Sequence, residues 1–425
     1  PLGHDYLVNP EPLSPPTQRF LKTLGARSLS LEQYITDLLP GLLDRDPPDE
    51  SRRNLVVELA KHVDHITEMD GAVRKLRELP LIESTSASPR FVKGSSAYFD
   101  DPTIRAVLGD NVLFAVLGSD DPDTERQLFE LVGVSASPQA KDVVAAVEEI
   151  VATGRTEVTA ERAWQIAIHL GGLRLDLDEH TRRVYSSLKD LAWLPCENSD
   201  DFRVHDELHT TDFQRLFESQ GKFLNFGIGN RNAARPFLVN WLDVKIQPEP
   251  KLVVDHLLWC SEHSQQVHNE VLPWLEERTQ EDAAAIELLR DKACIPVGTS
   301  TDPATGESRC DYLEPNRVFR GPHRFGKFRT QLGETLLRYP SLLTLLGVKE
   351  SPDADDACQV LIEIGNSHAR PAEPLEREVL DIVWHCWGLI DSQLYRFGGV
   401  QLFRRFRDCP VVPNTRGMLC TPDQV

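Results

Sequence analysis

Two features are missing from this 425-residue sequence and a third is scarce, and each of these deficits excludes a class of function. No stretch approaches 18 uninterrupted apolar residues, so no segment is expected to span a membrane as a helix. No Gly-x-x-x-x-Gly-Lys-Ser/Thr sequence occurs, which excludes a P-loop nucleotide site. Positive charge is scarce, because 46 Lys and Arg face 66 Asp and Glu and the net charge is −20. Such a chain does not coat nucleic acid non-specifically, although a local basic site remains open.

Cysteine is sparse and unevenly placed. None of the eight cysteines precedes residue 196, and no two of them form a Cys-x-x-Cys pair. A secreted disulfide framework has a higher cysteine content in a shorter chain. We therefore expect reduced, mostly buried thiols in an intracellular protein of the cytoplasm or nucleus.

An internal repeat is the most informative feature that is present. Four segments share a short apolar run that closes at a proline or, in the first copy, at Glu83; they are 79–83, 192–195, 293–296 and 409–413. A polar, turn-forming stretch and a second short apolar run follow, which is typical of a β-hairpin. The closing residues are successively 112, 101 and 117 residues apart.

A second marker recurs in phase with the first. It is a Leu-Gly-Val type sequence that ends at Val134, Val244 and Val348, so its copies are 110 and 104 residues apart. A proline follows each valine four residues later, and apolar residues at helical spacing come next; these prolines are Pro138, Pro248 and Pro352. Because proline is favoured in the first turn of a helix, we expect a helix to begin at each proline. Helical spacing also occurs at 55–79 and 161–170.

Together the markers predict a helix-rich α+β chain of tandem repeats in an elongated array. Each repeat has about 110 residues and combines a β-hairpin with several helices. The predicted segments are 1–73 (an N-terminal proline-rich segment and helices), 74–187, 188–288 and 289–403 (three repeats), and 404–425 (the start of a truncated fourth). Because the sequence stops inside the motif, we expect it to be a piece of a longer protein.

These motifs resemble the repeats of sacsin-like proteins. The resemblance consists of an Ile/Leu-Pro hairpin, a Pro-Asp/Asn-x-Val second strand (315–318 and 422–425) and a Leu-Gly-Val-x-x-x-Pro helix start, and it covers roughly residues 74–425. Sacsin-like proteins, including the plant NO VEIN type, are large and carry a GHKL (Bergerat-fold) ATPase domain near the start. The resemblance implies a chaperone-like scaffold, with the ATPase elsewhere in the full-length protein.

Two fragments come near the motifs of such an ATPase. Glu50 and Asn54 have the Glu-x-x-x-Asn spacing, and the sequence from Asn225 to Gly229 approaches Asp-x-Gly-x-Gly. The residue that should bind adenine is Asn225 instead of an aspartate, and about 170 residues separate the fragments. We expect this chain to be non-catalytic and to hold no cofactor.

Three residue pairs could form metal or nucleophile sites, but an ordinary structural role is favoured for each. His62 and His65 share a predicted helix face without another ligand nearby, so we expect a solvated face and no metal site. A thiol and an imidazole can form a nucleophilic pair, and the candidates are Cys260 with His263 and Cys386 with His385. Both pairs lie among apolar residues and tryptophans, where buried core cysteines are the commoner case.

Two basic stretches, 317–329 and 395–407, contain no acidic residue and are the best candidates for a partner or anion site. The candidate residues are Arg317, Arg320, Arg324, Lys327, Arg329, Arg404, Arg405 and Arg407, and Arg396 lies in the second stretch. Arginines interleaved with Phe319, Phe325 and Phe328 would grip phosphate and stack bases, or would pair with an acidic peptide. The alternative is that they neutralise acidic faces of neighbouring repeats.

The leading functional hypothesis is a non-enzymatic scaffold that binds a protein client or partner. The first alternative is a nucleic-acid-binding module that uses the C-terminal basic stretches. The second is an enzyme whose site is assembled between repeats. No metal, membrane or small-molecule substrate is indicated.

Overall fold

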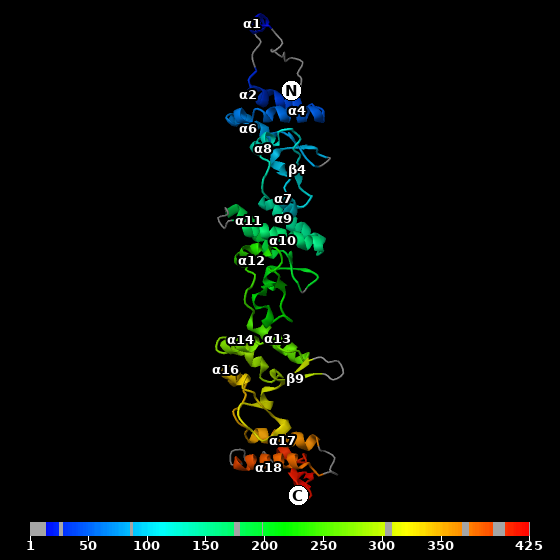
Figure 1. Cartoon of the computed structure of the whole chain (residues 1–425), viewed down its shortest axis with the longest axis vertical. Helices are drawn as coiled ribbons and strands as arrows, with labels where there is room; N and C mark the ends of the chain where they lie inside the picture. The colour runs from blue at the N-terminus through cyan, green and yellow to red at the C-terminus, as the bar shows by residue number, and fades with distance from the viewer. Residues whose placement is uncertain are drawn as a thin grey trace. The chain divides into compact units, whose positions relative to one another are not determined.

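The computed structural model describes residues 14–24, 29–85, 88–173, 179–197, 199–301, 308–367, 374–393 and 404–424 (Figure 1). It is helix-rich with small two-stranded sheets, so the predicted α+β class is confirmed. Contacts divide the chain into unit 1 (Pro1–Leu208 and Leu224–Val244) and unit 2 (His209–Phe223 and Lys245–Val425), each described by itself. Within the described ranges, no helix has the length and apolarity needed to cross a bilayer.

Helices are the main regular elements of both units. Those of unit 1 are α1 (Pro15–Thr23), α2 (Leu31–Gln33), α3 (Leu39–Leu43), α4 (Asp49–Ala60), α5 (Val63–Thr67), α6 (Asp70–Glu78), α7 (Pro102–Leu108), α8 (Pro122–Leu131), α9 (Ala140–Thr153), α10 (Glu157–Gly172), α11 (Glu179–Ser186) and α12 (Arg235–Asn240). Those of unit 2 are α13 (Pro250–Glu262), α14 (Val271–Glu277), α15 (Ala283–Ile286), α16 (Pro340–Leu345), α17 (Ala354–Ser367) and α18 (Arg377–Ser392).

The single helix predicted over 55–79 is instead three helices, α4, α5 and α6. The chain leaves the helical conformation at His62 (φ −110°, ψ 14°) and at Met69 (φ −110°, ψ 84°). A straight helix of this length would extend for about 37 Å at 1.5 Å per residue, too far for both ends to face one small core. The two breaks let all three helices bury apolar residues in the same core.

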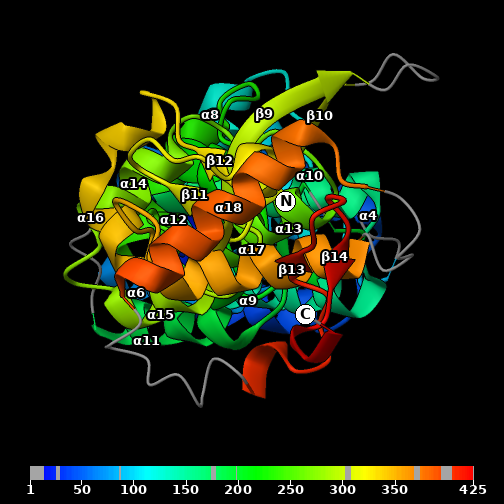
Figure 2. The same cartoon turned by 90° about the horizontal axis from the view of Figure 1, so that it is seen from below.

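All four predicted hairpin segments form antiparallel pairs of strands, but the prediction that the Pro-Asp/Asn-x-Val sequences form the second strand is wrong. They follow the second strand as the short helices η8 (Pro315–Arg317) and η11 (Pro422–Gln424). The pairs are β1 (Ile82–Glu83) with β2 (Phe91–Val92), β5 (Leu194–Pro195) with β6 (Phe202–Arg203), β9 (Ile295–Thr301) with β10 (Ser308–Leu313), and β13 (Val412–Pro413) with β14 (Leu419–Cys420). The strands are two residues long except in β9 and β10, which have seven and six residues and form the long ribbon seen in Figure 2. Short strands of this kind depend on the apolar residues beneath them for stability.

A second set of short strands was not predicted. β3 (Ala97–Phe99) runs parallel to β4 (Leu113–Ala115), and β11 (Val318–Phe319) runs parallel to β12 (Thr330–Gln331). β7 (His209–Thr210) and β8 (Phe223–Leu224) occupy the corresponding place in the sequence. Single parallel bridges also join Tyr98 to Ser135, His209 to Lys245 and Phe319 to Lys349, just beyond each Leu-Gly-Val type marker.

The marker itself is a helix-ending turn. Its central residue has a positive φ in every copy: 100° at Gly133, 60° at Asp243 and 83° at Gly347. Glycine adopts this left-handed conformation without a Cβ clash, and aspartate tolerates it better than most residues do. In the first copy the amides of Gly133 and Val134 both donate to the carbonyl of Phe129, which satisfies the end of α8.

The helices expected after the marker are present, but the position of each proline was predicted wrongly. Helices α9, α13 and α17 begin two residues after Pro138, Pro248 and Pro352. Gln139 and Glu249 are the N-cap residues of α9 and α13, so each proline lies just outside its helix. Proline there restricts the preceding residue to an extended conformation, which also fixes where a helix can start.

Four hydrophobic cores succeed one another along the chain. Unit 1 holds core 1 (from Ile35 to Val134) and core 2 (from Tyr98 to Val244), and unit 2 holds core 3 (from Leu216 to Val348) and core 4 (from Phe319 to Leu419). In core 4, α17 and α18 lie side by side (Figure 1 and Figure 2). The division into segments 1–73, 74–187, 188–288, 289–403 and 404–425 stays a prediction.

Candidate interaction surface

The first basic stretch is folded against α17 and α18 of unit 2. It runs from η8 (Pro315–Arg317) through β11 to η9 (Gly326–Phe328). Gly326 allows the return towards β12, because its φ is +53° and a Cβ there would lie 2.8 Å from Cδ1 of Ile382 on α18. The backbone conformation therefore favours glycine at this position, and a larger residue would also displace the end of the Ile382 side chain.

One glutamate of α17 neutralises two of the candidate arginines. Nη1 of Arg329 donates to Oε1 and Oε2 of Glu363, at 3.1 and 3.0 Å, and to the carbonyl oxygen of Phe328 at 2.7 Å. Arg317 lies 3.8 Å from the same carboxylate. Arg329 is only 4% exposed, so it is not available to a partner. This pair supports the alternative in which the arginines neutralise the protein's own acids.

The remaining charges of the first stretch are more accessible. Nη2 of Arg320 donates to Oγ1 of Thr344 at 2.7 Å, while its Nε is buried without a hydrogen-bond partner among the described residues. Arg324 and Lys327 are exposed, and neither forms an ion pair with any residue that the structure describes. These two cations are what the stretch offers to an anionic partner.

The interleaved aromatic residues do not form a stacking surface. Phe319 and Phe325 are buried in core 4, and their rings pack edge to face with centroids 6.2 Å apart. Phe328 is half-buried, with Nζ of Lys327 5.8 Å from its ring centre. The expectation that Phe319 and Phe325 stack bases is therefore wrong. They alternate with arginines because one side of this segment faces core 4 and the other faces solvent.

The second basic stretch is described only from Arg404 onward, and Arg396 lies outside the described residues. Arg405 forms an ion pair with Asp355 in the first turn of α17. Arg404 and Arg407 are exposed and have no ion pair within the described ranges. Of the eight candidate cations, three are thus paired with acids of α17, namely Arg317, Arg329 and Arg405.

Two histidines near the first stretch are kept neutral. Burial lowers the pKa of His323, a hydrogen bond with the backbone of Thr330 opposes this, and the charge of Arg329 adds to the lowering. Burial also lowers the pKa of His385, helped by Arg324. At neutral pH the positive charge here comes from arginine and lysine alone.

The thiols are poorly suited to nucleophilic chemistry. Burial raises the pKa of Cys386 to about 12 and that of Cys260 to about 11, so both stay protonated at neutral pH. The imidazole beside Cys260 belongs to His256, whose Nε2 is 3.7 Å from Sγ, while His263 stacks on Trp259. Burial lowers the pKa of His256, which makes it a weak base.

The other singled-out residues are not assembled into a site. His62 caps α5 and His65 lies within it, and the described residues contain no cluster of three or more metal-ligating side chains. Glu50 and Asn54 lie on α4, which packs in core 1, whereas Phe226 beside Asn225 packs in core 2. The two ATPase-like fragments therefore belong to different cores.

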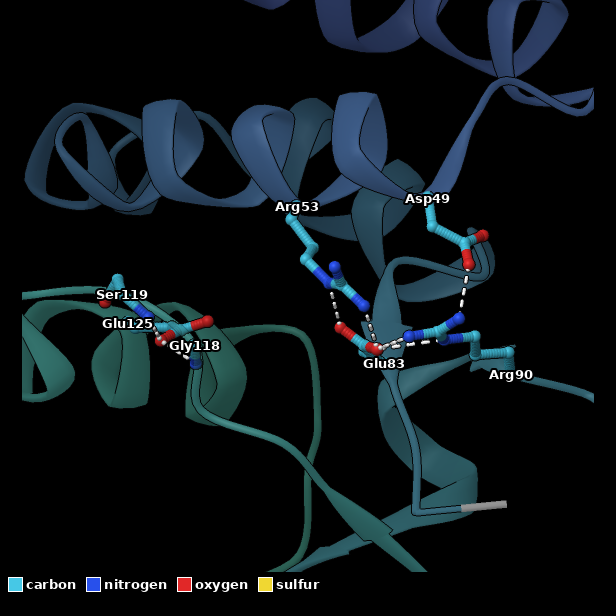
Figure 3. A network of polar contacts seen from close by, with 7 residues as sticks. All are labelled: Asp49, Arg53, Glu83, Arg90, Gly118, Ser119 and Glu125. Carbon is cyan, nitrogen blue, oxygen red and sulfur yellow. Dashed lines mark hydrogen bonds and ion pairs between the residues drawn. The ribbon is translucent and has the colours of Figure 1, made fainter. Parts of the chain in front are cut away.

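Sequence reasoning missed a polar network in unit 1 (Figure 3). Nε and Nη2 of Arg53 donate to Oε2 and Oε1 of Glu83 at 2.6 and 2.7 Å. Arg90 joins the same carboxylate to Asp49, with contacts of 2.9 and 2.6 Å. One signal of this network was available in the sequence, since the first copy has Glu83 where the other copies have the closing proline. In the structure this acid binds two arginines, Arg53 and Arg90.

Comparison with known proteins adds no relative: no family model matches the chain, and neither does a curated protein or a solved structure.

Proposed function

We propose that this chain is a non-catalytic interaction scaffold of sacsin-like tandem repeats that binds protein clients. The observation that carries the proposal is the succession of four small cores, each of which includes one antiparallel strand pair. A repeat of about 110 residues is large enough to bury an apolar face of its own, so a series of such repeats suits a tandem array.

The side chains support a binding role over cysteine-dependent catalysis. The thiols that the sequence singled out are protonated and buried, and their imidazole neighbours are weak bases. At the same time, several large apolar side chains are exposed. The bulkiest of them is Trp384 on α18, which is 57% exposed. Exposed tryptophan is enriched at protein interfaces, where it anchors contacts.

The test is calorimetric titration with reduced, carboxymethylated α-lactalbumin, a soluble chain that cannot fold. Client binding through apolar contacts predicts a negative heat-capacity change and little dependence on salt. Trp384→Ser should weaken binding several-fold, whereas Asp391→Ser, at an exposed position of the same helix, should not. Absence of binding, or binding that vanishes at moderate salt, would contradict the proposal.

A second candidate function, nucleic-acid binding, is favoured by the exposed Arg324, Lys327, Arg404 and Arg407, which form no ion pair with the residues that the structure describes. It predicts an affinity for short single-stranded or duplex oligonucleotides that falls steeply with salt, because binding releases counterions. Arg324→Glu combined with Lys327→Glu should abolish it. No binding at about 50 mM salt would remove this candidate.

A further inference from the structure

We propose that a small pocket in unit 1 binds the ammonium group of a lysine side chain from a protein partner, with Glu125 as its counter-ion. The inference rests on the proposed scaffold function only in that the lysine belongs to a protein. It concerns a site separate from the basic stretches.

Glu125 is a buried acid without a cation. It lies in the first turns of α8, is 4% exposed and forms no ion pair with any described residue. The other buried carboxylate of the described chain, Asp356, lies 3.0 Å from Nζ of Lys349. Buried charges in proteins are normally paired, because removing an ion from water is costly. An unpaired buried carboxylate therefore needs an explanation.

Only one oxygen of Glu125 is satisfied. Oε2 accepts hydrogen bonds from the backbone amides of Gly118 and Ser119, both at 3.0 Å. Oε1 has no partner among the described residues. In Figure 3 it is turned away from these amides, towards the side on which Arg53 and Glu83 lie. The amides and the dipole of α8 reduce the cost of the charge and leave one oxygen free for a ligand.

Glu125 lines a pocket of about 30 Å³. The apolar walls come from α4, the first hairpin, the residue after β4 and α8, through Val56, Leu81, Phe91, Val116 and Phe129. Arg53 and Glu83 complete the lining, but the guanidinium of Arg53 is already bound by both oxygens of Glu83. Among the residues that the structure describes, no cation of the lining is thus left for Glu125.

The local charge defines what the pocket can accept. Arg53 and Arg90 are paired with Glu83 and Asp49, so the charge of Glu125 has no cationic partner among the described residues. A single positive charge balances it. Calcium and magnesium require about six or more oxygen ligands, whereas this pocket offers one free oxygen among apolar walls.

A primary ammonium fits better than a guanidinium. Lysine carries a compact charge on a methylene stem, whereas the arginine head is planar and broad, and about 30 Å³ is little more than a water molecule needs. The ammonium group alone would fill this volume, so the stem would lie outside the pocket against exposed apolar residues, as lysine stems commonly do. Val116 lines the pocket and is 38% exposed, so it lies at the mouth; the next residue, Leu117, is 41% exposed, and both would contact the stem and the neighbouring residues of the partner.

The test uses the whole chain, labelled with ¹⁵N, and n-butylammonium chloride as a probe of the lysine side chain. We expect saturable shifts of the Gly118 and Ser119 amide signals that sodium chloride at equal ionic strength does not produce. Glu125→Gln keeps a carbonyl for the two amides but removes the charge, and should weaken the response at least tenfold. Glu130→Gln, on the same helix and paired with Arg126, is the matched control.

Several outcomes would overturn the proposal. They are equal shifts with sodium chloride, no shift in the unaltered chain, or a full response in Glu125→Gln. If Glu125→Gln does not fold, Val116→Phe at the mouth of the pocket must block the response instead. Because the probe is no protein, failure here leaves the scaffold proposal to its own titration. Conversely, a chain that binds no client can still bind butylammonium.

Discussion

The buried arginine Arg329 is the residue on which core 4 depends electrostatically. Its guanidinium is held by Glu363 and by a backbone carbonyl, and its exposed fraction is 4%. Arg329→Met would fill a similar volume but leave Glu363, which is half-buried, without its main partner. Removing one partner of a buried pair typically costs about 3–5 kcal/mol, and we expect about 2–3 kcal/mol here because Glu363 retains some solvent.

Urea denaturation followed by tryptophan fluorescence measures this loss. Arg324→Met, a few residues away and exposed, is the control and should leave the free energy of unfolding unchanged. Equal effects of the two substitutions would mean that the Arg329–Glu363 pair contributes nothing specific.

His209 should make the stability of unit 2 depend on pH. Neither of its ring nitrogens has a hydrogen-bond partner among the described residues, and the ring packs against Phe217 with centroids 4.8 Å apart. Burial lowers the pKa of His209 below its ordinary value, and Lys245 adds to this while Glu249 opposes it. The unfolded chain therefore binds a proton at a higher pH than the folded chain does.

The free energy of unfolding should consequently fall as the pH drops from about 7 to about 5, through the ordinary histidine pKa near 6.5. His209→Phe should reduce this slope, and His180→Gln, at an exposed position, should not. The slope will not vanish, since burial also lowers the pKa of His256 and His385. Denaturation curves at pH 7.5 and 5.5 provide the comparison, and an unchanged slope in His209→Phe would refute the assignment.

At the scale of elements, the left-handed residue of the Leu-Gly-Val type marker controls how α8 ends. Gly133 has φ +100°, and a Cβ there would meet nothing closer than 3.8 Å, so Gly133→Ala adds backbone strain alone. We expect a loss of about 1–2 kcal/mol in stability.

Gly41→Ala is the matched control for Gly133→Ala. Gly41 lies within α3, and nothing is within 4 Å of the position that its Cβ would take. Alanine in place of glycine in a helix gains about 0.5–1 kcal/mol, so the two substitutions should have opposite signs in thermal denaturation. A loss at both positions would mean that the conformation of Gly133 is not what matters.

The sequence predicted those elements that local chemistry determines. Turn residues and apolar alternation located the four antiparallel pairs, and the positive φ at Asp243 shows why an aspartate could replace glycine in one marker. The parallel pairing of β3 with β4, and the Tyr98–Ser135 bridge, join segments whose separation in the chain gives no local signal. Such contacts depend on the core that forms between them.

The candidate site was predictable only as a set of charges. Nothing near Arg329 in the sequence distinguishes it from the exposed Arg324, because its partner Glu363 is 34 residues away. Glu125 likewise lacks a motif. Its significance comes from a pocket whose walls are drawn from four separate segments.

At the scale of the molecule, the four separate cores predict unfolding in more than one step. Phe325 is fully buried in core 4, and Phe325→Ala should cost about 3–5 kcal/mol there. In scanning calorimetry we expect more than one transition, with only that of unit 2 shifted by the substitution. A single transition that moves as a whole would show that the chain unfolds cooperatively.

The uneven distribution of cysteine has a practical consequence at the same scale. Six of the eight thiols are buried, Cys409 and Cys420 are partly accessible, and Cys196 is the one that belongs to unit 1. An alkylating reagent can modify a buried thiol only while the surrounding structure is transiently open. The rate of modification at each position therefore measures a local opening free energy, and mass spectrometry can map it in the unaltered chain. The native cysteines therefore report local opening without any introduced label, at one position in unit 1 and at seven in unit 2.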